Sequence, residues 1–121
     1  MWDAKGKLLG QPVSNLLGEK SRERLRAYYT GNVPEALQEF GIRDMKIAIP
    51  CGPAHGEEGM RKNEETVARA RDVLGRGGFL ALDTHMAWDV SYTLRMYERL
   101  EKHNILWIEE PVLPDPVATI W

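Results

Sequence analysis

Two acidic side chains stand where short apolar runs of the chain end. Asp83 follows the run FLAL at 79–82, and Glu109 follows ILWI at 105–108. In parallel α/β folds the carboxyl ends of the strands form the edge at which ligands bind. Positions 83 and 109 are 26 apart, the length of one helix-plus-strand unit, so we expect both carboxylates at the same edge. Two converging oxygen donors suit a hard divalent cation such as Mg²⁺, which completes its shell with water and substrate.

A simpler interpretation of these acids stays open at this point. A single Asp or Glu after a strand is usually a helix cap or a solvated loop residue. Two acids at matched strand ends weigh against that interpretation without excluding it. Glu110 is the weaker candidate, because successive side chains of a strand point to opposite faces. We expect Glu110 to be a neighbour of the metal ligands or a substrate contact.

Short β-like runs alternate with helix-like runs along the chain. The sequence predicts strands at 25–29, 45–49, 79–82 and 105–108. Helices are predicted after three good N-cap residues, namely Asn32, Asn63 and Asp89. Helical spacing predicts a buried face on the last of these helices, formed by Val90, Leu94, Tyr97 and Leu100. Residues 1–18 are predicted to be the end of a helix followed by a turn, and 51–59 a long turn-rich loop.

This alternation predicts the fold class. Nearly continuous apolar strands separated by helices indicate a parallel sheet covered by helices. Right-handed crossovers of this kind build either a doubly wound sheet or a (β/α)8 barrel. Periodicity alone does not choose between the two architectures.

Composition restricts the function classes. A chain of 121 residues, 43% hydrophobic and 28% charged, is expected to form one soluble globular domain. A net charge of −2 with interleaved acids and bases argues against nucleic acid or a membrane as partner. The single cysteine, Cys51, cannot form an internal disulfide, and the chain has no long apolar run or leader. We therefore expect a cytoplasmic protein.

Several short motifs resemble the mandelate racemase branch of the enolase superfamily. The runs LALD at 80–83 and WIEEP at 107–111 are similar to the first two metal-ligand strands of that branch. The segments WDAKGK (2–7), GPA (52–54), GMRKN (59–63) and MAWDV (86–90) resemble the L-rhamnonate dehydratase family in particular. The resemblance implies a partial (β/α)8 barrel of about four strands. It also implies three parts: the end of a capping domain at 1–20, the first half of the barrel at 21–115 and a divergent tail at 116–121.

The resemblance also implies an activity. The implied activity is that of a magnesium-dependent acid-sugar dehydratase, a lyase that removes water from a sugar acid through an enediolate. The resemblance implies that Asp83 and Glu109 are its metal ligands. Magnesium on the substrate carboxylate stabilises the charge that forms when the adjacent proton leaves, and enolase-superfamily sites are themselves a standard example of this arrangement. The full-length family is expected to form homo-oligomers and to act on a small-molecule sugar acid.

Two further residues are candidates for the site. Many relatives carry Lys-x-Lys in the second strand, and the second lysine acts as a base. Here Lys46 matches the first lysine, and Ala48 stands in place of the second. We expect a structural, electrostatic or substrate-binding role for Lys46. His85 lies two residues after Asp83, so strand periodicity would aim it at the same site. Asp-x-His supplies the general acid in galactonate-dehydratase-like relatives, and His85 is a candidate general acid or substrate contact. A polar rim residue is the open alternative.

The remaining distinctive side chains are expected to be structural. This group comprises Trp88, Tyr92 and Trp107 as packing residues, His55 as a solvated loop residue, His103 as a cation near a helix C-terminus and Cys51 as an unreactive thiol.

Two functional readings remain open from the sequence. The family's third metal ligand and its His–Asp base come from later strands, which this sequence does not include. The chain is therefore either part of a dehydratase completed by further barrel strands, or a non-catalytic remnant. Such a remnant would at most bind magnesium or associate with a full-length relative. Four parallel strands cannot close a barrel, so we expect the isolated chain to be poorly stable, oligomeric or prone to aggregation.

Overall fold

The structure is a computed structural model that describes residues 1–18, 22–33, 37, 39 and 41–114. The strands are β1 (Tyr29–Thr30), β2 (Met45–Ala48), β3 (Leu80–Asp83) and β4 (Ile105–Glu109). The helices are α1 (Trp2–Leu9), α2 (Val13–Leu16), α4 (Gly56–Leu74) and α5 (Val90–Leu100), with 3₁₀ turns η1 (Pro53–His55) and η2 (Glu101–His103). Within the described ranges, none of the helices has the length and apolar character to cross a membrane.

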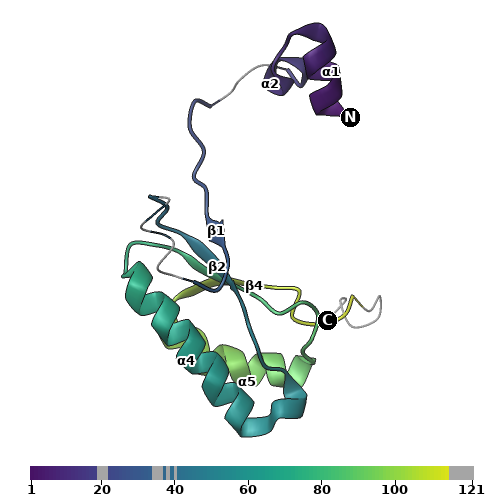
Figure 1. The fold of residues 1–121 in the computed structure, drawn as a ribbon. Helices are drawn as coiled ribbons and strands as arrows, with labels where there is room; N and C mark the ends of the chain where they lie inside the picture. The colour runs from purple at the N-terminus through teal and green to yellow at the C-terminus, as the bar shows by residue number, and fades with distance from the viewer. Residues whose placement is uncertain (19–21, 34–36, 38, 40, 115–121) are drawn as a thin grey trace.

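The four strands form one parallel sheet in the order β1-β2-β3-β4. Each strand therefore lies beside its neighbour in sequence, and α4 and α5 connect β2 to β3 and β3 to β4 on the same side of the sheet (Figure 1). A doubly wound sheet reverses its strand order and carries helices on both faces. The observed order and one-sided cover are those of successive units of a (β/α)8 barrel.

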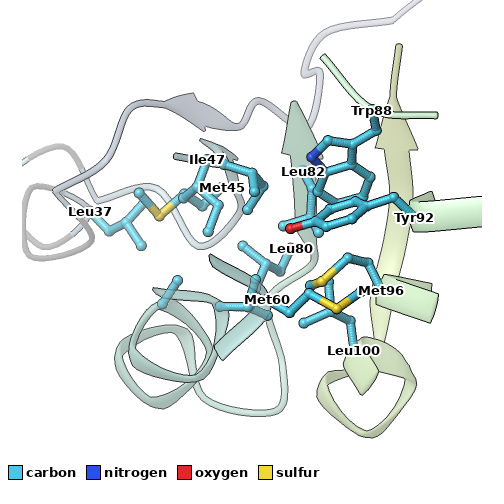
Figure 2. Close-up of a cluster of buried hydrophobic side chains, with 13 residues drawn as sticks. Leu37, Met45, Ile47, Met60, Leu80, Leu82, Trp88, Tyr92, Met96 and Leu100 are labelled. Atoms are coloured by element: carbon cyan, nitrogen blue, oxygen red, sulfur yellow. The ribbon is translucent and has the colours of Figure 1, made fainter. Parts of the chain in front are cut away.

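The hydrophobic core lies between the sheet and these two helices (Figure 2). Alternate residues of β2 and β3 point into it, as the two-residue strand period requires. They meet apolar side chains at three- and four-residue spacing on the helices. The buried members are Leu37, Met45, Ile47, Ile49, Met60, Val67, Ala70, Leu80, Leu82, Trp88, Tyr92, Met96 and Leu100.

Aromatic rings lie on the opposite face of the sheet, near the amino ends of the strands. Phe79 contacts Tyr28 and Trp107, with ring centroids 5.6 and 5.5 Å away. Arg26 lies over the Phe79 ring at 5.1 Å and forms an ion pair with the buried carboxylate of Asp44. This face carries the charged residues described in the next subsection.

The predicted strand at 25–29 is largely wrong. The strand occupies Tyr29–Thr30, and residues 25–28 lie outside it. The ladder explains the shift, because Tyr29 and Thr30 are the residues that pair with Met45 and Lys46. Leu25 is exposed, so it adds no buried apolar side chain to the sheet. The other three strands were predicted to within about one residue.

The helix predicted to begin after Asn63 begins earlier, at Gly56, so Asn63 is not its cap. The segment 51–59, predicted to be a loop, contains η1 and the first turn of α4. Asn63 is fully buried inside the helix, and its amide bonds both the N–H and the C=O of Cys51. Tertiary hydrogen bonding thus overrides the usual preference of Asn for a helix end.

The predicted buried face of α5 is confirmed at Leu100 and wrong at its other three positions, and the Asp89 N-cap is confirmed by a 2.7 Å hydrogen bond from Tyr92 N. The buried residues are Tyr92, Met96 and Leu100, whereas Val90, Leu94 and Tyr97 are exposed. Both sets have helical spacing, so the pattern alone was ambiguous. Tyr92 turns inward because its ring contacts Trp88 and its hydroxyl bonds Asn63.

Helices α1 and α2 form a pair that lies away from the sheet, and residues 22–28 lead into β1 without forming a helix or strand (Figure 1). This agrees with the predicted helix end and turn in 1–18, with Gly10 as a left-handed C-cap (φ 61°). The predicted helix after Asn32 falls largely on residues outside the described ones, and the whole of the tail at 116–121 lies outside them. The division of the chain at residue 20 stays a prediction.

Candidate metal centre

Asp83 and Glu109 lie side by side at the carboxyl ends of β3 and β4, where they form a register pair. This register depends on an irregularity in β4. Leu80 pairs with Ile105 and Leu82 with Ile108, so one extra β4 residue is inserted between the two pairs. A bulge of this kind re-aims the side chains that follow it. Without it, Ile108 would stand opposite Asp83, and the Glu109 carboxylate would lie one residue beyond.

Lys46 joins the two carboxylates. Its Nζ lies 3.0 Å from Asp83 Oδ2 and 2.8 Å from Glu109 Oε1. Lys46 comes from the middle of β2 and is 8% exposed. Its stem crosses the sheet on the face opposite the core, because its neighbours Met45 and Ile47 point into the core. Three adjacent strands therefore bring one cation and two anions to a common point.

These contacts determine the charge state of the three groups. Hydrogen bonds to Glu109 and Asp83 raise the pKa of Lys46 above its ordinary value. The same bond from Lys46, with one from Trp107, lowers the pKa of Glu109. Burial alone would raise the pKa of Asp83, but hydrogen bonds from Lys46 and the His85 amide outweigh it and lower the pKa. All three groups are charged at neutral pH.

His85 contacts the site, though not for the reason that the sequence suggested. Strand β3 ends at Asp83, and His85 adopts a left-handed conformation (φ 52°) in the following turn. Its Nδ1 lies 3.0 Å from Asp83 Oδ1, and its N–H donates to the same oxygen at 3.2 Å. The His85 side chain is 66% exposed. It is thus positioned beside a candidate ligand and open to an incoming molecule.

Trp107 is a site neighbour that the sequence interpretation missed. Its Nε1 donates to Glu109 Oε2 at 3.2 Å, while its ring packs on Phe79 and Tyr28. The signal was the i, i+2 spacing of Trp107 and Glu109, which places both on one face of a strand. Trp107 therefore both packs against the aromatic rings and orients the Glu109 carboxylate.

Glu110 contributes through its backbone. It has a positive φ of 46°, and its carbonyl accepts hydrogen bonds from Met86 N and Thr84 Oγ1, both at 2.7 Å. The Glu110 side chain is exposed. These bonds join the turn after β3 to the end of β4. They fix the position of His85, which lies between the two donors in sequence.

The donor chemistry of Asp83 and Glu109 fits a magnesium ion. Magnesium is commonly bound by one or two carboxylates together with water and substrate oxygens. Across 1–18, 22–33, 37, 39 and 41–114, no group of three or more His, Cys, Asp and Glu residues is arranged to hold a metal ion. The described residues thus offer two ligands of such a site.

The other distinctive residues lie elsewhere. Cys51 is buried, and the Trp88 indole donates to its carbonyl at 3.0 Å, so both residues are structural. His55 bonds the backbone of Gly52 in the turn before α4. Burial lowers the pKa of His103, and the nearby positive charge of Lys102 lowers it further. His103 is the last residue of η2, as expected for a residue near a helix end, but the lowered pKa disfavours its cationic form.

Comparison with known proteins identifies the relatives of this chain. The family model for enolase C-terminal domain-like proteins matches residues 30–120. A protein of Caldivirga maquilingensis, provisionally named as an L-rhamnonate dehydratase, is 37% identical over 115 residues, covering 95% of this chain and 29% of that protein.

Two solved structures give the same picture. L-rhamnonate dehydratase from Gibberella zeae superposes with a TM-score of 0.83 at 34% identity, covering 97% of this chain and 30% of that one. A structure of rhamnonate dehydratase from the same organism complexed with Mg gives a TM-score of 0.84 at 36% identity, with coverages of 97% and 29%. The chain thus spans less than a third of the length of each of these relatives.

Proposed function

This chain belongs to the enolase C-terminal domain-like family, and on that premise we propose that it carries the metal-binding part of a magnesium-dependent acid-sugar dehydratase site. The observation that supports the proposal best is the convergence of Asp83 and Glu109 on Lys46 at the ends of neighbouring strands. L-rhamnonate is the first substrate to test, because relatives at 34–37% identity carry that name.

In this proposal each residue has a distinct part in the chemistry. Asp83 and Glu109 would hold Mg²⁺, which when bound supplies Lewis-acid stabilisation of negative charge on the substrate carboxylate. Lys46 and Trp107 orient the two carboxylates through the hydrogen bonds described above. Removal of the proton next to the substrate carboxylate is left to residues of later barrel strands, as the family resemblance implies.

His85 is proposed to protonate the departing hydroxyl. Elimination of water requires an acid at the leaving oxygen. Asp83 holds the imidazole through Nδ1 at 3.0 Å, which leaves Nε2 as the nitrogen for a substrate hydroxyl. This pairing of an imidazole with an orienting carboxylate is common where a histidine transfers protons. Because Asp-x-His resembles galactonate-dehydratase-like relatives, other aldonates are also candidate substrates.

The alternative is a non-catalytic remnant, and one observation favours it. The described residues supply two metal ligands, and the chain spans less than a third of its relatives. Catalysis would then require the remaining strands from additional chain or from a second protein. We also propose that the chain has three parts: the end of a capping domain at 1–20, a half-barrel at 21–115 and a divergent tail at 116–121. We further propose that the protein is cytoplasmic.

A chimera tests the catalytic proposal within a complete barrel. Residues 30–114 would replace the corresponding segment of the Gibberella zeae enzyme, and formation of 2-keto-3-deoxy acid from L-rhamnonate and other aldonates would be measured. We expect turnover that Asp83→Asn and Glu109→Gln each reduce by more than about a hundredfold, since losing even a partner of a metal ligand costs roughly 10- to 100-fold. Asp72→Asn, an exposed carboxylate on α4, is the matched control.

The chain itself is tested in parallel. Purified 121-residue protein with Mg²⁺ and the same substrates distinguishes the two readings directly. Turnover that Asp83→Asn abolishes would favour an active enzyme. A folded, magnesium-binding chimera with no turnover on any aldonate would contradict the dehydratase proposal and favour the remnant.

A further inference from the structure

Every oxygen of the two candidate metal ligands already has a donor among the described residues. Asp83 Oδ1 is contacted by His85, and Glu109 Oε2 by Trp107. The other two oxygens, Asp83 Oδ2 and Glu109 Oε1, are both held by Lys46 Nζ. Lys46 is therefore the group that contacts both ligands at once, in the position that a shared cation would take.

We infer that Lys46 is the resident counter-cation of this carboxylate pair, holding Asp83 and Glu109 together in the metal-free protein and competing with a divalent cation for their oxygens. The inference rests on the proposed metal-binding role of these two acids. It assigns Lys46 a positioning role that sets how strongly a metal ion binds.

Electrostatics supports the first half of this role. Both carboxylate oxygens lie next to one nitrogen, so they are within about 6 Å of each other, where two like charges repel appreciably at partly buried positions. The side chains of Lys46 and Asp83 are only 10% and 13% exposed, and that of Glu109 is 38% exposed, so solvent screening is weakened most at Asp83 and Lys46. Without the ammonium group the pair would separate or take up a proton, and the ligand geometry would be lost.

The chemistry of lysine supports the second half. An ammonium group is a compact point charge on a flexible four-carbon stem, and it can withdraw without unfolding its surroundings. Ala48, the next residue of β2 on the same face, pairs with Asp83 and has a side chain of one methyl group. Alanine therefore places no bulky side chain on this face beside the Asp83 carboxylate. A divalent ion must displace or share both oxygens, so each metal-binding event works against the lysine contacts.

Replacing Lys46 separates these two effects. In Lys46→Met the metal-free chain should melt at a lower temperature than the wild type, because the acids repel each other. The same variant should bind Mn²⁺ about tenfold more tightly, since no internal cation competes. Lys46→Arg should bind Mn²⁺ about tenfold more weakly, because a guanidinium bridges carboxylates through several fixed donors.

The experiment uses the full 121-residue chain. Mn²⁺ affinity would be measured by electron paramagnetic resonance, and melting would be followed with a chelator and with Mg²⁺. Lys62→Met is the charge-matched control, since Lys62 is an exposed lysine on α4, and its Mn²⁺ affinity should equal that of the wild type. Lys46→Arg keeps the charge and serves if Lys46→Met does not fold.

The outcomes are distinguishable. Tighter binding by Lys46→Met, weaker binding by Lys46→Arg and a larger Mg²⁺-induced rise in melting temperature for Lys46→Met would support the inference. Equal Mn²⁺ affinities for the wild type and both variants would overturn it while leaving the metal proposal intact. Absence of Mn²⁺ binding in all of these proteins would overturn the metal-binding proposal itself.

Discussion

Asn63 is a single buried polar residue that holds the segment after β2 against the two helices. Its amide bonds Cys51 N at 3.1 Å, Cys51 O at 2.9 Å and the Tyr92 hydroxyl at 3.2 Å. These bonds join the segment that follows β2 to both α4 and α5. Buried amides are stabilising only when such partners are present, since an unsatisfied buried group costs about 1–3 kcal/mol. The residue therefore acts as a connection between three elements.

The first prediction concerns this connection. Asn63→Leu should lower the free energy of unfolding by about 2–4 kcal/mol, because it leaves the Cys51 N–H and the Tyr92 hydroxyl without their partner. Tyr92→Phe removes one of the three bonds and should cost about 1 kcal/mol. Urea unfolding followed by circular dichroism measures both values. Equal losses for the two variants would contradict the role assigned to Asn63.

The second prediction is a pH dependence at Asp44. A hydrogen bond from Arg26 lowers the pKa of Asp44, burial opposes this, and a bond from the Phe79 amide adds to the lowering. A carboxyl with a lowered folded pKa stabilises the protein above its unfolded value of 3.8. That stabilisation is lost as the pH falls through the folded pKa. The free energy of unfolding should therefore decrease below about pH 4.

Asp44→Asn tests this sign. The variant should be less stable at neutral pH by about 1–2 kcal/mol, and its stability should change less between pH 4 and pH 2 than that of the wild type. Other acids also titrate in this range, so the difference between variant and wild type is the relevant quantity. Urea unfolding at several pH values measures it, with Asp72→Asn as a charge-matched control. Parallel curves for Asp44→Asn and wild type would refute the assignment.

At this scale the sequence predicted which acids meet at the sheet edge better than it predicted their contacts. Asp83 and Glu109 were predictable because residues at the ends of adjacent parallel strands must share an edge. The Lys46 bridge was not, since side-chain reach across three strands is not encoded in local spacing. Trp107 was assigned to packing alone, because a single sequence does not reveal that its indole N–H meets a carboxylate.

Among the elements, the end of α4 is joined to two strands by Arg71. Its guanidinium donates to the carbonyls of Gly75 and Gly78 before β3, at 3.0 and 2.8 Å. It also donates to those of His103 and Asn104 before β4, at 2.8 and 2.9 Å. One side chain thus satisfies four carbonyls at the amino ends of β3 and β4. Both strands that carry the candidate metal ligands are contacted by this side chain.

The third prediction follows from that connection. Arg71→Met should lower the free energy of unfolding by about 2–3 kcal/mol, because hydrogen bonds from a charged donor are worth about 1.5–3 kcal/mol each and several are lost, partly replaced by water. Amide hydrogen exchange should accelerate most in β3 and β4. Arg61→Met is the control, since its exposed ion pairs with Glu58 and Glu65 are screened by solvent and should contribute little to stability. Uniform acceleration across the chain would contradict a local role.

The strands were easier to predict than the helices for a physical reason. Strands β2, β3 and β4 are short apolar runs with breaking residues on both sides, so their bounds are local. Strand β1 has two residues and exists only through its ladder with β2. The start of α4 depends on η1 and on the buried Asn63, and the bulge in β4 depends on packing against β3. Both are tertiary effects that local patterns cannot show.

For the molecule as a whole, the sheet has two open sides. In the described part of the chain, β1 and β4 each pair with one neighbour only. Beside β4 lies an apolar groove of about 480 Å³. Its lining residues include Tyr97, Leu100, Ile105, Leu106 and Ile108. In a closed eight-stranded barrel such a surface would be covered by the next strand and helix.

The last prediction concerns this open side. An edge strand with unpaired backbone groups and apolar neighbours promotes association, so the chain should self-associate in a concentration-dependent manner. Leu106 is 59% exposed on β4, and Leu106→Lys should weaken association by about tenfold or more, because edge lysines oppose strand pairing. Leu8→Lys, on exposed α1, should have no such effect. Sedimentation velocity over a concentration series measures both variants. A monomer with a sharp, concentration-independent melting transition would show instead that these four strands are stable with both edges open.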